Sequence, residues 1–430
     1  MHPTTRSLVA LVVLAGALGA QSPRTVVLEG QALPGGGTVT GIRFVHMIPG
    51  GYWLVQVTTD QPHRPSAVLR REGLWPAAGP VWKQVGDPVT QPAGARIAGF
   101  DSFTNELFGG VCWNARLQDT PGGDTDDEAL YFENSLWIQE GPIGSWPQTD
   151  FPAGSRWLSF DDLRCSLQSG EVLLRGHADD PTMAGPDETF VAVGGLCGSI
   201  GILCTLDRIG QEGWPAVGTG RLIEAVRLEP GAAAVSPNSY RFLWSCDLEG
   251  PAETDGCVYS FSYPAQNELL AQEGSQSPVA GRRWGPLDDL GLQVNSSGSW
   301  TMRATLDAGD PTSDALIVKD GSVFVREGDS VPDIAPFTFD GFGRGRAQLD
   351  QSGSVVWYGR WDEHGHPSAA LFRDDRLLVR TGQTTIDGRL LVGLSSGPDD
   401  LALTPQGELL IFKGTLEGGV EGAFVLELGP

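Results

Sequence analysis

Between positions 314 and 382 the chain shows one unit of about 54 residues twice. The first copy reads Asp-Ala-Leu-Ile-Val-Lys-Asp-Gly-Ser-Val-Phe-Val-Arg-Glu-Gly and ends at Gly328. The second reads Ser-Ala-Ala-Leu-Phe-Arg-Asp-Asp-Arg-Leu-Leu-Val-Arg-Thr-Gly and ends at Gly382. In each copy a short apolar segment is followed by a tight polar turn and by a second apolar segment. Asp-Gly between two β-prone segments is a strong hairpin signal, so the unit is predicted to be a repeated β-hairpin.

The glycine ending of this unit recurs along the chain. The seven endings are Gly30, Gly86, Gly141, Gly210, Gly274, Gly328 and Gly382, at intervals of 56, 55, 69, 64, 54 and 54 residues. A period of this size is typical of propeller blades and solenoids.

A second polar turn lies between successive glycine endings. The stretch Leu349-Asp-Gln-Ser-Gly-Ser-Val-Val-Trp-Tyr358 shows the pattern, and similar stretches occur at 167–176, 294–303 and 403–412. Each places a glycine, which tolerates positive φ, between two apolar segments. Each unit then holds about four strands, in the fifth unit at 288–294, 299–305, 314–319 and 322–327. Four antiparallel strands repeated seven times predict an all-β fold, a seven-bladed β-propeller.

The two ends of the chain differ from the other units. The final unit lacks a fourth strand that ends in glycine, whereas segment 25–30 is such a strand with no partner before it. If the N-terminal strand pairs with the last blade, the ring closes and no sheet edge is left exposed. We therefore expect residues 21–430 to form one closed propeller domain; an open array with unpaired ends is the alternative.

The first twenty residues have the pattern of a secretory signal peptide. Arg6 supplies a positive charge, residues 8–18 form an apolar segment too short to span a bilayer comfortably, and small residues end at Ala20. A retained membrane anchor is the alternative. No other segment is long and apolar enough for a membrane span. The protein is predicted to be exported to the periplasm, the cell envelope or the medium.

The chain is strongly acidic, with a formal net charge of −24. Removal of residues 1–20 would leave 28 basic and 53 acidic side chains. Such a surface repels phosphate backbones and anionic lipid headgroups, which argues against nucleic acids and membrane surfaces as partners. We expect a monomer that binds an unidentified protein or glycan.

The cysteine count is even, and in an exported chain this predicts disulfides rather than metal ligands or nucleophiles. Six cysteines allow fifteen pairings. Their positions favour Cys197–Cys204 and Cys246–Cys257, each pair flanking a predicted hairpin, which leaves Cys112 with Cys165.

The repeated unit resembles that of tandem-repeat exported proteins of environmental bacteria, in which segments of the type Ala-Leu-Phe-x-x-Asp-x-Leu-Leu-Val-x-x-Gly follow a signal peptide. The resemblance covers nearly all of the chain after residue 20. It implies the propeller fold, and it implies no activity and no catalytic residues.

Two units are longer than the others, with predicted insertions at 178–187 and 229–238. Insertions in repeat folds fall on loops, where function is often located. Aromatic side chains on the connections between units are also candidates for exposed contact surfaces. This expectation concerns Trp146, Trp157, Trp214 and Trp284.

Two short polar stretches are candidate metal sites. The acidic stretch 119–128 offers carboxylates that calcium prefers, and His364 and His366 lie beside Asp362 and Glu363. Both stretches fall where loops between strands are expected, and neither shows a complete ligand pattern. We interpret them as solvated turns and predict no metal ion and no cofactor.

The first strand of each blade should line the central channel, and carboxylates there would suit hydrolysis of sugars. The candidates are Asp101, Asp161, Asp162, Glu224, Asp288, Asp289, Asp340 and Asp399. An apolar residue followed by Asp recurs in four units, which favours a structural role such as binding backbone N–H groups. We therefore predict no catalytic residue and a non-catalytic binding or scaffolding protein. A carbohydrate-active hydrolase or lyase is the alternative, and a purely structural envelope protein is a third hypothesis.

Overall fold

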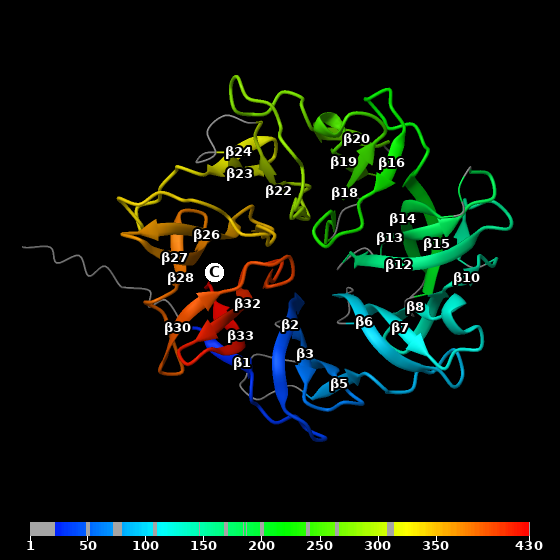
Figure 1. Cartoon of the computed structure of the whole chain (residues 1–430), viewed down its shortest axis with the longest axis horizontal. Coiled ribbons are helices and arrows are strands. Elements are labelled where there is room, and N and C mark those ends of the chain that lie inside the picture. Colours follow the sequence, from blue (N-terminus) through cyan, green and yellow to red (C-terminus); the bar gives the residue numbers. More distant parts are fainter. Residues whose placement is uncertain are drawn as a thin grey trace, which may run out of the picture.

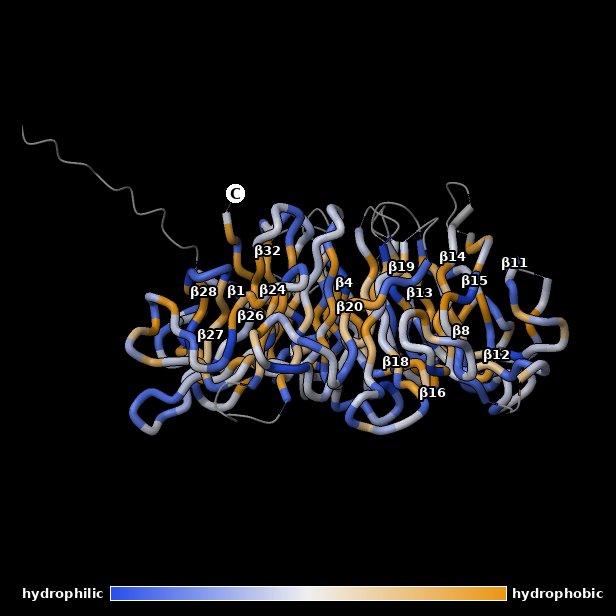
Figure 2. The backbone as a smooth tube through the Cα atoms, turned by 90° about the horizontal axis from the view of Figure 1, so that it is seen from above, coloured by the Kyte–Doolittle hydropathy of each residue, from blue (hydrophilic) through white to orange (hydrophobic). Residues whose placement is uncertain are grey.

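A computed structural model describes residues 22–48, 52–71, 80–105, 110–145, 147–166, 171–183, 185, 187–197, 202–237, 241–262, 266–307 and 314–429 of the 430-residue chain. Seven sheets are arranged around a common axis, as Figure 1 shows. The predicted all-β fold, a seven-bladed propeller, is confirmed. Seen edge-on, the ring is a flat disc in which hydrophobic strands lie between two faces of more hydrophilic turns (Figure 2).

Each blade contains four main strands that pair in sequence order. Blade 1 has β2 (Val39–Ile48), β3 (Tyr52–Thr59), β4 (Ser66–Arg71) and β5 (Val81–Gln84), and blade 2 has β6 (Arg96–Asn105), β7 (Val111–Gln118), β8 (Glu128–Phe132) and β9 (Ser135–Gln139). Blade 3 has β12 (Arg156–Cys165), β13 (Glu171–Asp179), β14 (Glu188–Cys197) and β15 (Ile202–Gln211). The short strands β10 (Gly141–Pro142) and β11 (Gln148–Thr149) lie at the two edges of this third sheet.

The remaining blades follow the same plan. Blade 4 has β16 (Ile223–Val226) and β17 (Ala233–Val235), which both pair with β18 (Arg241–Leu248), followed by β19 (Cys257–Ser262) and β20 (Glu268–Gln272). Blade 5 has β21 (Gln293–Val294), β22 (Trp300–Thr305), β23 (Ala315–Lys319) and β24 (Ser322–Arg326). Blade 6 has β25 (Gln348–Leu349), β26 (Val355–Glu363), β27 (His366–Arg373) and β28 (Arg376–Arg380). Blade 7 has β29 (Thr385–Ile386), β30 (Arg389–Leu394), β31 (Leu401–Leu403), β32 (Leu409–Leu416) and β33 (Val420–Glu427).

The N-terminal strand β1 (Arg24–Leu28) supplies the fourth strand of blade 7. It pairs antiparallel with β33, so that Arg24 lies opposite Val425 and Leu28 opposite Gly422. The predicted closure of the ring is therefore confirmed. Seven hydrophobic clusters pack between neighbouring blades, and the one between blades 7 and 1 includes Val26 and Val27 of β1.

The repeated glycines mark the passage from one blade to the next. Their φ values lie between 71° and 119° at Gly30, Gly86, Gly141, Gly213, Gly274, Gly328 and Gly382. At Gly86 and Gly328 the amide donates to the carbonyl of Ile97 (2.8 Å) and of Phe339 (3.0 Å), near the start of the next blade.

In the third unit the prediction of Gly210 as this marker is wrong. Gly213 has the positive φ of 77°, and its amide donates to the carbonyl of Ile223 at 2.8 Å. Gly210 lies within β15, where a Cβ atom would come within 2.5 Å of the Trp244 ring. It is therefore a close-packing position, and the true intervals around Gly213 are 72 and 61 residues.

Tryptophans on second strands pack against aromatic residues on third strands. Trp113 stacks on Tyr131 at 4.5 Å, and Trp357 stacks on Phe372 at 4.7 Å; in both pairs the partners lie directly opposite in register. Such pairs stabilise a sheet beyond the area they bury. The expected exposure of Trp157 and Trp284 is wrong, because both side chains are buried between blades. Trp214 is half-buried, and Trp146 lies outside the described residues.

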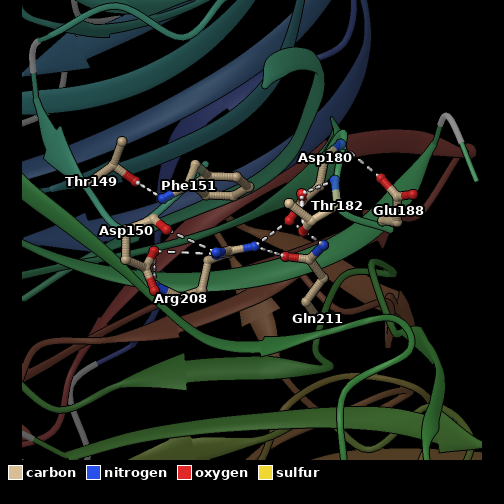
Figure 3. A network of polar contacts seen from close by, with 8 residues as sticks. All are labelled: Thr149, Asp150, Phe151, Asp180, Thr182, Glu188, Arg208 and Gln211. Carbon is tan, nitrogen blue, oxygen red and sulfur yellow. Dashed lines mark hydrogen bonds and ion pairs between the residues drawn. The ribbon is translucent and has the colours of Figure 1, made fainter. Parts of the chain in front are cut away.

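The two predicted insertions have different structures. Part of 229–238 is a strand, β17, which pairs with β18 as Ala233 opposite Trp244, so this stretch belongs to the sheet. The stretch 178–187 begins with the last two residues of β13, and its described part after Asp179 is held by a buried polar network around Asp180 and Arg208 (Figure 3).

In this network the Arg208 Nη1 atom lies 2.7 Å from Asp180 Oδ2, and the Arg208 Nε atom lies 3.2 Å from Asp150 Oδ1. Thr182 donates to Asp180 from its amide (2.9 Å) and its hydroxyl (2.7 Å). Burial opposes ionisation of Asp180, but the hydrogen bonds from Thr182, Arg208 and Gln211 hold its pKa below the ordinary value. The side chains of Asp180 and Arg208 are only 1% and 7% exposed. The pair therefore fixes the connection to the sheet.

We expect Arg208→Met to lower the free energy of unfolding by about 3–5 kcal/mol, because it leaves the Asp180 carboxylate buried without its ion pair. Urea unfolding followed by tryptophan fluorescence measures this change. The exposed pair Arg360–Asp340, at 2.9 Å, gives the matched control: Arg360→Met should cost less than about 1 kcal/mol. Equal effects of the two substitutions would contradict the structural role assigned to Arg208.

Candidate functional site

A cavity of about 110 Å³ lies on the axis of the ring, and every blade contributes to its wall. One residue from each blade, in order, is His46, Thr104, Arg164, Val235, Gln293, Gln348 and Leu401. Most of these residues lie on the first strand of their blade. A smaller cavity of about 50 Å³ shares Val45, His46, Arg164 and Asp399 with it. The cavity therefore depends on closure of the complete ring.

Asp162 on β12 binds two arginines, of which Arg164 lines this cavity. Its carboxylate lies 2.9 Å from Arg164 Nε and 2.6 Å from Arg175 Nη2. Although burial opposes ionisation, Arg164 and Arg175 lower the pKa of Asp162 to about 2. Asp162 and Arg164 are two positions apart on one strand and so point to the same side of the sheet. The Asp162 carboxylate is therefore shared between two cations.

Arg346 enters the cavity from the segment before β25. A Cβ atom at Gly231 would lie 3.3 Å from the Gly291 backbone and 4.0 Å from Arg346 Nε, so the arginine stem passes close to glycine backbone of blades 4 and 5. The Nε and Nη2 atoms of Arg346 are buried and have no hydrogen-bond partner among the described residues. Burial first, and then the charge of Arg164, lower the pKa of Arg346 to about 10.

His46 on β2 faces the same group of charges. Burial first, and then the charge of Arg164, lower the pKa of His46 to about 4, although Asp399 acts in the opposite direction. The imidazole is therefore neutral at neutral pH, and it can both donate and accept a hydrogen bond.

The charges around the cavity do not balance. Two arginines, Arg164 and Arg346, and one aspartate, Asp399, line the main cavity, while His46 is neutral. The Asp162 carboxylate that pairs with Arg164 is shared with Arg175. A buried charge without a partner is costly, and an anion in the cavity would compensate it. This excess of positive charge occurs in a chain whose net charge is −24.

Only half of the predicted channel carboxylates reach the axis. Asp101, Asp161, Asp162 and Asp399 line the smaller cavity. Glu224 instead lines a separate pocket between blades 3 and 4. The other three form ion pairs, which are Asp288 with Arg227 (3.5 Å), Asp289 with Arg344 (2.7 Å) and Asp340 with Arg360 (2.9 Å).

In two units the recurring apolar-Asp step forms ion pairs rather than the predicted hydrogen bonds to backbone N–H groups. Asp101 pairs with Arg116 at 3.2 Å, and Asp340 pairs with Arg360 in the same way, each from a first-strand position to the second strand. These aspartates therefore link neighbouring strands within a blade.

Sequence reasoning missed Glu128 on β8. Burial first, together with the nearby charges of Asp101 and Asp161, raises the pKa of Glu128 to about 7, although the Phe160 amide donates to it at 2.7 Å. Its carboxylate faces the next blade and lines neither central cavity. No repeated pattern marks this position, so only the contact between blades 2 and 3 reveals it.

The two candidate metal stretches form hydrogen-bonded turns. Asp126 accepts a hydrogen bond from the Gly122 amide (3.0 Å), and Asp362 accepts one from the Gly365 amide (2.5 Å). His364 packs edge-on against Phe337 at 5.1 Å. In the described part of the chain, no group of three or more His, Cys, Asp or Glu side chains is placed to hold a metal ion.

The structure places each predicted cysteine pair on neighbouring segments. Cys246 and Cys257 lie directly opposite each other on β18 and β19. Cys197 and Cys204 lie on adjacent strands β14 and β15, and Cys112 and Cys165 belong to one cluster between blades 2 and 3. Cys165, Cys246 and Cys257 carry free thiols, and burial raises the pKa of Cys257 to about 12. The three disulfides remain a prediction.

Solved structures show a likeness to this chain at low sequence identity. No protein-family model matches the sequence, and no curated protein matches it. A puromycin-hydrolysing peptidase of Mycobacterium tuberculosis is similar over 93% of this chain and 56% of its own length, with 13% identity and a TM-score of 0.45. A polysaccharide lyase is similar over 95% and 91%, with 8% identity and a TM-score of 0.39.

A sialidase of Trypanosoma rangeli is similar over 94% of this chain and 58% of its own length, with 10% identity and a TM-score of 0.34. The chain thus spans little more than half of the peptidase and of the sialidase. The likeness to these three proteins, at TM-scores below 0.5, assigns no activity to this chain.

We expect the stability of the protein to rise between pH 5 and pH 7 partly through His46. In this range the unfolded chain binds a proton at this histidine, whose ordinary pKa is 6.5, while the folded chain, with a pKa of about 4, does not. Because His46 is partly exposed, the expected contribution is about 1–2 kcal/mol. Urea unfolding at both pH values should show that His46→Asn reduces the rise by this amount.

The exposed His63 offers the matched control. The His63→Asn variant is expected to follow the parent protein across the same pH range. If His46→Asn also follows the parent, the low pKa assigned to His46 is wrong.

Proposed function

We propose that this chain is a non-catalytic binding propeller whose central cavity holds a small anion, or the carboxylate group of a larger ligand. The observation that carries the proposal is the Arg346 guanidinium, whose buried Nε and Nη2 atoms have no hydrogen-bond partner among the described residues. A guanidinium offers a planar fork of donors that matches a carboxylate. Arg164 lies on the same wall and adds a second positive charge.

The size of the cavity supports a small ligand group. A volume of about 110 Å³ is below the roughly 300–1,000 Å³ of pockets that enclose whole ligands. It suits a few water molecules or a group of several heavy atoms, since one water occupies about 30 Å³ in the liquid. The ligand would therefore be a small organic acid, or an acidic group on a glycan or protein that reaches the axis.

The alternative of a sugar hydrolase has less support. That reaction needs two carboxylates on either side of a bound sugar, one of them protonated. Of the carboxylates that line the smaller cavity, Asp162 is bound to two arginines, and Asp101, whose pKa is raised by burial, is paired with Arg116 at 3.2 Å. Glu128, whose pKa burial raises to about 7, lines neither cavity. The wall of the main cavity carries arginines, which favours binding of an anion over general-acid catalysis.

Several sequence-based predictions belong to the same proposal. We propose that residues 1–20 are removed on export, that the exported protein is a monomer, and that it contains the three disulfides. The free thiols at Cys246 and Cys257 lie opposite each other, so oxidation would join two strands that already pair. Within the described residues, no helix is long and apolar enough to cross a membrane.

We expect acetate and propionate to raise the melting temperature of the protein and to bind in calorimetry at low salt. Arg346→Met should weaken this binding by about 10- to 100-fold, because a charge-assisted hydrogen bond contributes about 1.5–3 kcal/mol. The variant should unfold no more readily than the parent protein, since an apolar side chain replaces a guanidinium that has two buried atoms without hydrogen-bond partners among the described residues.

Arg344→Met is the matched control. Arg344 lies two residues away, and its exposed side chain pairs with Asp289 at 2.7 Å. This variant should bind the same anions with unchanged affinity. The proposal fails if acetate and propionate do not bind, or if both variants bind them equally well.

A further inference from the structure

A second pocket, of about 230 Å³, lies where blade 3 meets blade 4 and is lined by acidic side chains. Its wall includes Met183, Glu188, Glu212, Ile223, Glu224 and Glu249. Met183 comes from the connection between β13 and β14, and its methyl group lies over Gly213, where a Cβ atom would come within 2.4 Å of it. The pocket is therefore attached to the same connection that the Asp180–Arg208 pair holds in place.

Glu188 is the buried member of this group and is only 3% exposed. Its Oε2 atom accepts a hydrogen bond from the Asp180 amide at 3.0 Å, as Figure 3 shows. Its Oε1 atom is buried and has no hydrogen-bond partner among the described residues. A Cβ atom at Gly185, which also lines the pocket, would lie 3.5 Å from this oxygen. A buried carboxylate oxygen thus faces the pocket without a donor.

No cation of the described chain compensates these carboxylates. None of Glu188, Glu212, Glu224 and Glu249 takes part in an ion pair within the described residues. Every lysine of the sequence, and every arginine except Arg6, belongs to the described part. Arg221, close to Glu224 in sequence, directs its donors to the carbonyl oxygens of Leu248, Glu249 and Thr254.

We infer that this pocket binds an organic cation, an ammonium group on a short apolar stem. The unpartnered oxygen of Glu188 and the surrounding carboxylates would accept its N–H donors, and the side chains of Met183 and Ile223 would contact the stem. A bare metal ion fits less well, because the described residues contain no group of three or more ligating side chains placed to hold one. The cation could be a free amine or the side chain of a lysine in a peptide.

Calorimetric titration of the purified protein at low salt tests this inference. Butylammonium should bind and n-butanol, which has the same stem without the charge, should not. Glu188→Gln should weaken butylammonium binding by about 10-fold or more, because the charged acceptor is lost. Glu171→Gln, which changes another buried glutamate of blade 3, is the matched control and should leave the affinity unchanged.

A second variant covers the case in which Glu188→Gln does not fold. Glu224 and Glu249 are exposed at the rim of the pocket, so the double variant Glu224→Gln/Glu249→Gln should fold and bind butylammonium several-fold more weakly. Absence of butylammonium binding, equal binding of n-butanol, or unchanged affinity in the double variant would overturn the inference.

Two further experiments identify the source of the cation and test whether this pocket binds independently of the central cavity. An acetylated and amidated Ala-Lys-Ala peptide that binds as well as butylammonium would identify a lysine side chain as the source, whereas binding of butylammonium alone would identify a free amine. Arg346→Met should leave butylammonium binding unchanged, since the central cavity is a different site. Loss of amine binding in this variant would contradict the assignment to the pocket between blades 3 and 4.

Discussion

The pairing of β1 with β33 is the contact on which the rest of the structure depends. Without β1, blade 7 would end in the unpaired edge of β33, and the cluster between blades 7 and 1 would lose Val26 and Val27. Closure also brings the first strands of all seven blades to one axis. The central cavity needs residues from every blade, so it exists only in the closed ring.

The buried charged side chains of this ring fall into two groups, those that form ion pairs and those that do not. Most buried charges have partners, as in Asp180 with Arg208 (2.7 Å) and Asp350 with Arg373 (2.8 Å), and these pairs fix connections and turns. Arg346 on the axis and Glu188 between blades 3 and 4 differ, because neither forms an ion pair among the described residues and each also keeps buried polar atoms without a hydrogen-bond partner there. Since such groups are costly, these are positions where a ligand of opposite charge would stabilise the protein. The two sites would select ligands of opposite sign.

The repeat predicted the blades, their number and the closing strand, because the same packing and turn requirements recur in every unit. The repeat gave a wrong prediction in the third unit, where the glycine that makes the turn is Gly213. Gly210, which was predicted for this position, packs against Trp244 instead. The candidate sites were missed for a related reason. Arg346 and Glu188 belong to no repeated pattern, and the buried atoms that each leaves without a hydrogen-bond partner can be recognised only in the folded chain. The available signal for the central site was an arginine, Arg346, just before the first strand of blade 6 in a strongly acidic chain. The aspartates predicted to line the channel are mostly bound to arginines instead.

The most direct test of the central claim is anomalous diffraction from crystals of the protein grown with bromoacetate, at a concentration that saturates the shift in melting temperature. The closed ring with a cationic cavity predicts a bromine peak on the axis and a carboxylate within hydrogen-bond distance of the Arg346 guanidinium. It also predicts that this peak is absent from crystals of Arg346→Met. A cavity that contains only water under these conditions, or a guanidinium already paired with a side chain of the protein, would contradict it.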